Sequence, residues 1–214
     1  MKVYFVRHGQ TEFNAQNQYQ PLDSSLSQKG IEQAQFVAKR LTDIQINVVL
    51  SSNLKRAIQT AEIINEKLQK EHIQIKELRE AKRPSIFIGK NKADQFVMDV
   101  MSLTEEHADD PSWHYSDEEN FSDVKSRAIK ALQIITSRSE DHILVVTHGE
   151  FLRFILGILL IGEGLTFLEY KHIQNVLKTF SLGCVNVRGT FQFIILQTLW
   201  ERSLLKVLEI SNNI

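Results

Sequence analysis

Short apolar runs that end abruptly in polar residues alternate with segments of helical periodicity, and this alternation constrains the fold most. The apolar runs cover residues 1–6, 46–50, 73–78 and 143–147. The segments with helical spacing cover residues 31–41, 54–68 and 122–135, and a further helix is expected directly after residue 149. Compact apolar runs are typical of strands buried on both faces of a sheet. The pattern therefore predicts an α/β fold, a three-layer αβα sandwich with a mostly parallel central sheet and helices on both faces.

We expect one domain over residues 1–214 with an insertion or lid segment at about 82–121, where the periodicity weakens and irregular structure is expected. Residues 105–123 contain eight acidic side chains together with Trp113 and Tyr115. This stretch is either a solvated loop or a cover over a site, anchored by the two aromatic residues. Residues 180–199 are rich in β-branched and aromatic residues around Arg188-Gly189, which predicts a hairpin that is either a sheet edge or a homodimer contact.

Charge and cysteine content restrict the partners and the location of the protein. Lys plus Arg number 25 and Asp plus Glu number 26, so no net positive charge draws the molecule to nucleic acid or to an anionic membrane. The longest apolar stretch, residues 154–161, is far shorter than the roughly 18 to 20 residues of a membrane helix. The single cysteine, Cys184, cannot form an internal disulfide, and no charged-then-apolar leader opens the chain. We expect a cytoplasmic protein that binds anions locally.

Polar residues with the chemistry of a phosphate site follow several of the expected strands. Arg7 and His8 follow the first, Arg56 lies near the start of the helix after the second, Glu80 follows the third and His148 follows a later one. Ligands of open α/β sheets bind beyond the carboxyl ends of the strands, so these segments are expected to converge. Guanidinium groups match phosphate oxygens, and helix N-termini favour anions.

These residue types suggest phosphoryl transfer. Neighbouring cations disfavour protonation of His8 and leave a neutral ring nitrogen that can attack phosphorus. His148, protonated by the phosphate it contacts, can stabilise the equatorial oxygens, and Glu80 can supply the proton of the leaving group. A metal site is the alternative reading of the histidines, but neither belongs to a His-x-x-x-His pair and the arginines would repel a cation. No metal is therefore expected.

Five motifs in order resemble those of the histidine phosphatase superfamily, which has the phosphoglycerate mutase-like fold. Residues 6–11 (VRHGQT) with Asn14 resemble its Arg-His-Gly-x-Thr-x-x-Asn opening. The others are residues 26–34 (LSQKGIEQA), 51–61 (SSNLKRAIQTA), 78–80 (LRE) and 145–149 (VVTHG). The resemblance covers residues 1–160 well and the remainder loosely. Many relatives follow the acid with Gly-x-Trp-Glu-Gly, which is absent here, so the substrate is left open.

The resemblance implies a phosphomonoester hydrolase in which His8 becomes phosphorylated, with no metal or organic cofactor. It implies that Arg7, Asn14, Arg56 and His148 hold the phosphoryl group of a small phosphorylated substrate or a phosphate ion. Glu80 is the implied acid, with Glu77 as the nearby rival. A phosphoglycerate mutase and a non-catalytic phosphate or phosphoprotein binding module are the alternatives. Lys82, Arg83 and Lys90 either bind a second acidic group of the substrate or are solvated loop charges.

Overall fold

The computed structural model describes residues 1–179 and 195–196 of the chain. Its sheet has the strand order β3-β2-β4-β1-β5, and every pairing is parallel. The strands are β1 (Lys2–Arg7), β2 (Val48–Ser52), β3 (Glu71–Ile75), β4 (His142–Thr147) and β5 (Ile195–Leu196). The two histidine-bearing strands, β1 and β4, are neighbours in the sheet, with Arg7 opposite Thr147. Their carboxyl ends therefore meet at one edge.

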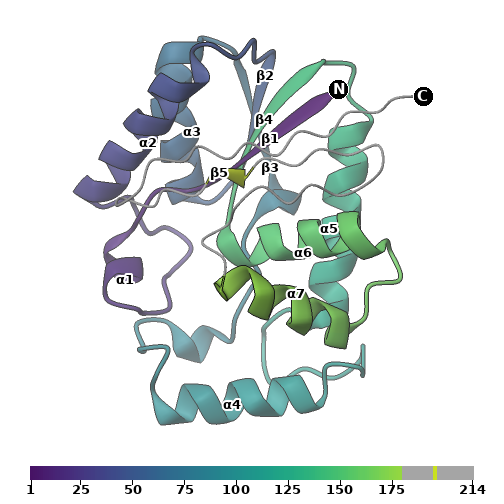
Figure 1. Cartoon of the computed structure of the whole chain (residues 1–214). Coiled ribbons are helices and arrows are strands. Elements are labelled where there is room, and N and C mark those ends of the chain that lie inside the picture. The colour runs from purple at the N-terminus through teal and green to yellow at the C-terminus, as the bar shows by residue number, and fades with distance from the viewer. Residues whose placement is uncertain (180–194, 197–214) are drawn as a thin grey trace.

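The helices form two layers around the sheet, and the helix of residues 95–106 lies apart from them (Figure 1). They are α1 (Glu12–Ala15), α2 (Gln28–Leu41), α3 (Lys55–Leu68), α4 (Gln95–Glu106), α5 (Phe121–Thr136), α6 (Gly149–Ile161) and α7 (Phe167–Thr179). Two short 3-10 helices are η1 (Lys76–Leu78) and η2 (Ser85–Phe87). Of these helices, none combines the length and the apolar character that a bilayer crossing requires.

Side chains of β1 alternate between two cores, as expected for a strand covered on both faces. Tyr4 and Val6 pack with α2 and α3, whereas Val3 and Phe5 pack with α5 and α6. All four side chains are almost fully buried. The predicted three-layer sandwich with a mostly parallel sheet is confirmed.

Strand β3 ends earlier than the sequence pattern indicates. The apolar run predicted a strand over residues 73–78, but β3 covers Glu71–Ile75 and residues 76–78 form η1. Its partner β2 ends at Ser52, opposite Ile75, so no ladder remains to extend the strand. The η1 turn buries Leu78, whose carbonyl oxygen accepts a 2.6 Å hydrogen bond from Thr147 Oγ1. This turn directs Arg79 and Glu80, the two residues that follow it, toward the edge of the sheet.

The expectation of irregular structure between residues 82 and 121 is wrong for residues 95–106, which form α4. Asp94 caps this helix by accepting a hydrogen bond from Phe96 N at 3.0 Å. Val97 and Val100 bury one face against Phe87, a small core separate from those of the sheet. Only β5 is described within the predicted hairpin, and it pairs in parallel with β1. The rest of that prediction, residues 180–194 and 197–199, lies outside the described residues, as does Cys184.

Candidate active site

The two site histidines lie side by side because they follow neighbouring strands. His8 N donates a hydrogen bond of 2.9 Å to Thr147 O, which continues the β1–β4 ladder by one residue. The ring centroids of His8 and His148 are 5.0 Å apart. His148 is fully buried, and its Nε2 lies 2.8 Å from Ser52 Oγ. The sheet thus brings together two imidazoles that are 140 residues apart in sequence.

The orientation of His8 is fixed by its own loop. Its Nδ1 lies 2.7 Å from Gly9 O, and because a carbonyl only accepts, Nδ1 carries the proton. The other nitrogen, Nε2, is then unprotonated and accepts a 3.3 Å hydrogen bond from Arg56 Nε. Burial, and then the charges of Arg56 and Arg7, lower the pKa of His8 well below its ordinary value. His8 is therefore a neutral imidazole at physiological pH, with Nε2 as its basic atom.

Two glycines hold the loop after β1 against the start of α2. A Cβ on Gly30 would lie 2.1 Å from Gln10 O, and one on Gly9 would lie 2.4 Å from Gly30 O. Gly9 N donates to Thr60 Oγ1 at 3.1 Å, and Gln10 N donates to Gln33 Oε1 at 2.9 Å. These contacts position the loop that carries His8, and all of them involve glycine, glutamine or threonine residues of the sequence motifs, namely Gly9, Gly30, Gln33 and Thr60.

Two arginines approach the histidines from different elements. Arg56, in the first turn of α3, is 2% exposed and donates through Nη1 to Ser24 Oγ at 3.3 Å. Arg7 ends β1, and its buried Nε has no hydrogen-bond partner among the described residues. Burial lowers the pKa of Arg7 and lowers that of Arg56 to about 10, so both stay charged at neutral pH. A buried cation with an unpaired donor suits an anionic ligand.

Glu80 sits at the N-terminus of α6. Its Oε1 accepts hydrogen bonds from Phe151 N at 2.9 Å and from Ala81 N at 3.1 Å, and its Oε2 accepts from Glu150 N at 3.3 Å. These three backbone donors fix the position of the Glu80 carboxyl group at the start of α6. Glu77, the rival in the sequence, is buried beside Lys130, 3.6 Å from its Nζ, and does not line the cleft.

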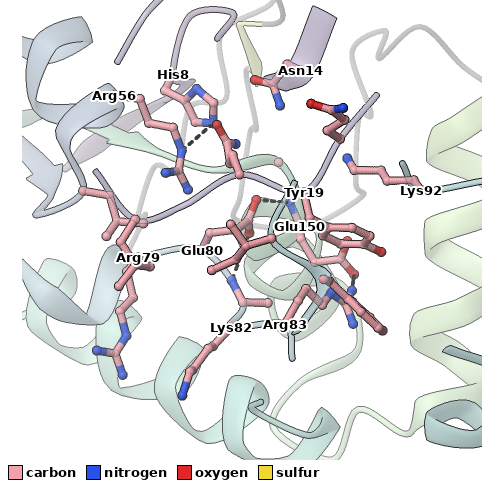
Figure 2. Close-up of a pocket in the computed structure, with 18 of the residues that line it drawn as sticks. His8, Asn14, Tyr19, Arg56, Arg79, Glu80, Lys82, Arg83, Lys92 and Glu150 are labelled. Carbon is pink, nitrogen blue, oxygen red and sulfur yellow. Dashed lines mark hydrogen bonds and ion pairs between the residues drawn. The ribbon is translucent and has the colours of Figure 1, made fainter. Parts of the chain in front are cut away.

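A cleft of about 610 Å³ connects these groups (Figure 2). Five of the six predicted site residues line it, namely Arg7, His8, Asn14, Arg56 and Glu80. The sixth, His148, is fully buried next to His8 and does not line the cleft. Asn14 lies in α1, where its Oδ1 accepts a hydrogen bond from Thr11 N at 3.3 Å. The cleft is thus a pocket rich in cations that presents the neutral imidazole of His8 and, beside it, the carboxyl group of Glu80.

Of the three cations proposed for a second acidic group, Lys82 and Arg83 are held in ion pairs, and Lys90 does not line the cleft. Lys82 Nζ lies 3.0 Å from Asp117 Oδ2, and Arg83 Nη2 lies 3.1 Å from Glu150 Oε1. Lys90 Nζ lies 5.5 Å from the centroid of the Phe96 ring and is not a lining residue.

Other residues give a mixed picture. Trp113 and Tyr115 line neither the cleft nor the cavity beside it, and Trp113 stacks on His107 instead. Lys92 and Glu150, which sequence reasoning missed, do line the cleft. Within residues 1–179, no three His, Cys, Asp or Glu side chains are grouped so that they could hold a metal ion.

The parallel α/β sheet presents two neighbouring histidines and two buried arginines at its carboxyl edge, an arrangement suited to binding a phosphoryl group. The model of the histidine phosphatase superfamily (branch 1) matches residues 3–185, and the chain belongs to this superfamily. The resemblance read from the sequence motifs is therefore confirmed. Membership supports an enzyme of the phosphatase or mutase type, which transfers or hydrolyses phosphoryl groups.

Individual relatives carry names of both types. Phosphoglycerate mutase-like protein 4 of Arabidopsis thaliana is 34% identical over 160 residues, which are 71% of this chain and 68% of that protein. A protein of Hydrogenobacter thermophilus, whose name refers to phosphoserine phosphatase, is 29% identical over 81% of this chain and 85% of its own. A mycobacterial glucosyl-3-phosphoglycerate phosphatase, solved with VO3, is 26% identical with a TM-score of 0.62, covering 74% of this chain and 81% of that one.

Proposed function

We propose that the protein is a metal-independent phosphomonoester hydrolase that works through a covalent phosphohistidine on Nε2 of His8. The observation that supports this proposal most directly is the hydrogen bonding of the His8 ring. Gly9 O accepts a hydrogen bond from Nδ1–H, and Arg56 Nε donates to Nε2 at 3.3 Å. A nucleophile needs an electron pair directed at the reacting atom. A bound phosphate would take over the Arg56 donor with its own oxygens, which would release the Nε2 electron pair for attack on phosphorus.

In the first step, the electron pair of Nε2 forms a bond to phosphorus while the bond from phosphorus to the ester oxygen breaks. Glu80, in its protonated form, gives its proton to that oxygen, so an alcohol leaves. In the second step, Glu80 takes a proton from water, the water oxygen bonds to phosphorus, and the bond to Nε2 breaks. Inorganic phosphate leaves and His8 is restored. Glu80 is suited to both transfers because it lines the same cleft as His8.

The charge of the transferring group is neutralised in this proposal by Arg7 and Arg56, with Asn14 as a further donor. His148 is neutral without ligand, because burial and then the nearby His8, Arg56 and Arg7 lower its pKa well below the ordinary value. A bound phosphate dianion would counter those charges and favour the protonated ring. The protonated His148, 5.0 Å from the His8 ring between ring centroids, would then stabilise the negative charge of the phosphoryl group electrostatically.

A mutase is the second candidate, favoured by the 34% identity to the mutase-like plant protein. It would use the same first step and return the phosphoryl group to an organic acceptor instead of water. A pure binding module fits less well, because binding alone needs neither the neutral imidazole nor a carboxyl group in the cleft. We further propose small phosphorylated molecules as substrates, no organic cofactor, and a cytoplasmic location in keeping with the single Cys184.

The test is hydrolysis of para-nitrophenyl phosphate across pH 4 to 9, with EDTA and with vanadate, for the wild type and His8→Ala. His172→Ala is the matched control, because His172 is exposed on α7 and lines neither cavity. We expect activity that resists EDTA, falls with vanadate and drops at least about 10³-fold in His8→Ala only. Rapid quenching should trap an acid-labile, alkali-stable phosphoryl group on the wild type. Activity retained by His8→Ala would overturn the proposal, and transfer to an added alcohol in place of water would favour the mutase.

A further inference from the structure

A second cavity, which we call the side chamber, adjoins the cleft on the side away from His8. It has a volume of about 360 Å³, and its walls include residues of α4, α5 and α7. The cleft and the side chamber share Tyr19, Arg83, Lys92 and Glu150 among their lining residues. If the phosphoryl group lies beside His8, the organic part of a substrate extends toward this shared wall.

Apart from Arg7 and Arg56, most cations that line the cleft or the side chamber lie in ion pairs with carboxylates. The ion pairs are Lys82–Asp117 at 3.0 Å, Arg83–Glu150 at 3.1 Å, Arg153–Glu150 at 3.4 Å and Lys171–Glu105 at 2.5 Å. Arg79 lines the cleft but is exposed, and its side chain extends away from His8 (Figure 2). Glu150 pairs with both Arg83 and Arg153, so one net positive charge remains in this group, but each of these cations is already held by a carboxylate.

Lys92 is different, because no ion pair involves it within the part of the chain that the structure describes. Its ammonium points into the cleft (Figure 2) and lies 5.5 Å from the centroid of the Tyr19 ring. The backbone is fixed by a 2.9 Å hydrogen bond from Lys92 N to Asn17 O, so the side chain starts from a defined position.

Charged groups of both signs face Lys92 from several elements. Partial burial and then the charge of Arg7 lower the pKa of Lys92, with Arg83 acting in the same direction and Glu80 and Glu150 opposing it. Lys92 lines the same cleft as Arg7 and His8, so its charge acts on the end of the cleft that would hold the phosphoryl group. Because the ammonium has no carboxylate partner of its own, an additional anion in the cleft would be stabilised next to it.

We propose that Lys92 binds a second anionic group on the leaving group of the substrate, so that the substrate is a phosphomonoester with a carboxylate or a second phosphate. This inference rests on the proposed function, because it takes the His8 end of the cleft as the site of the reacting phosphoryl group. The sequence suggested Lys82, Arg83 and Lys90 for binding such a group, and we propose Lys92 in their place.

The test compares esters with the same two-carbon chain. Phosphoglycolate carries a carboxylate, ethane-1,2-diol bisphosphate carries a second phosphate, and 2-hydroxyethyl phosphate carries a neutral hydroxyl. We expect Lys92→Met to lower kcat/KM for one or both anionic esters about 10- to 100-fold, mostly through KM, the range of one charge-assisted hydrogen bond. The neutral ester should change less than about 2-fold, and Lys92→Arg should keep most of the preference for the anionic ester.

Lys90→Met is the matched control, because Lys90 lies in the same segment but does not line the cleft. Binding of the same three esters to His8→Ala, followed by calorimetry, tests the inference without turnover. Loss of the anionic preference in the doubly substituted His8→Ala/Lys92→Met would support it even if the protein were not a hydrolase. Equal losses for charged and neutral esters, or no preference for an anionic ester in the wild type, would overturn it. A wild type that prefers anionic esters but hydrolyses none would overturn only the proposed function.

Discussion

Replacement of Glu150 by glutamine should destabilise the protein markedly. Its Oε1 accepts hydrogen bonds from Tyr170 Oη at 2.6 Å and from Gln174 Nε2 at 3.2 Å, and it pairs with Arg83 at 3.1 Å. Oε2 lies 3.4 Å from Arg153 Nη1. Glu150→Gln keeps the shape and one acceptor oxygen but removes the charge that balances Arg83.

The size of this destabilisation depends on how deeply the Glu150–Arg83 ion pair is buried. Loss of one partner of a fully buried ion pair costs about 3–5 kcal/mol. The side chains of Glu150 and Arg83 retain 19% and 30% of their exposure, so solvent screens part of the effect. We therefore expect a loss of about 2–3 kcal/mol in the free energy of unfolding, which lowers Tm by about 4–12 °C in a chain of this size.

The pH dependence of this loss has a definite sign. Burial by itself would raise the pKa of the Glu150 carboxyl, but the facing Arg83, helped by Tyr170 and Arg153, outweighs burial and lowers it. A carboxyl whose pKa is lower in the folded state stabilises above its unfolded pKa of about 4.3. The difference between wild type and Glu150→Gln should thus be constant from about pH 5 to 7. It should shrink as the pH falls through the lowered pKa of the folded state.

Urea unfolding at several pH values, with thermal unfolding at pH 7, measures both effects. The control is Glu105→Gln, since Glu105 pairs with Lys171 at 2.5 Å but is 43% exposed. An exposed pair contributes about 0–1 kcal/mol. If Glu150→Gln cost no more than Glu105→Gln, or if its cost grew toward acid pH, the assignment of Glu150 as the buried counter-charge of Arg83 would be wrong.

Two further substitutions address the His8 loop and His148. Gly30→Ala should cost about 1–3 kcal/mol and lower kcat/KM, because its Cβ would collide with Gln10 O, whereas Gly164→Ala has open space and should be nearly neutral. Thermal unfolding and para-nitrophenyl phosphate kinetics measure both changes, and similar results for the two variants would contradict the packing argument. Ser52→Ala removes the 2.8 Å partner of His148 Nε2 and should lower kcat about 10-fold with little change in KM. Ser51→Ala, on the opposite face of β2, is its control, and an unchanged kcat in Ser52→Ala would refute a positioning role for this hydroxyl.

Much of the cleft could be predicted from the sequence because parallel strands end at a common edge. His8 and His148 each follow a compact apolar run, and such runs in alternation with helices leave few topologies. Arg56 could be placed in the first turn of a helix by the same periodicity. In each case the information is local, since one strand or helix ends where its functional residue begins.

The wall that carries Lys92 has no comparable local pattern. It forms where residues 17–19 pair with residues 88–92, through Gly89 N to Tyr19 O at 2.9 Å and Tyr19 N to Lys90 O at 3.0 Å. Two polar loops that meet by backbone hydrogen bonds leave no periodicity in either segment. Helix α4 was missed because its apolar stripe is short and the acidic run after it dominates the composition.

The two ends of the cleft are therefore built by different means and should respond differently to substitution. The His8 end rests on strand ends and on glycine contacts such as that of Gly30, where backbone atoms leave no room for a Cβ. A disturbance there moves the nucleophile and should slow the hydrolysis of every ester by a similar factor. The Lys92 end is attached by loop pairing and by the Arg83–Glu150 pair. A change at Lys92 should leave neutral esters unaffected and alter only the discrimination between leaving groups, which depends on contacts remote from phosphorus.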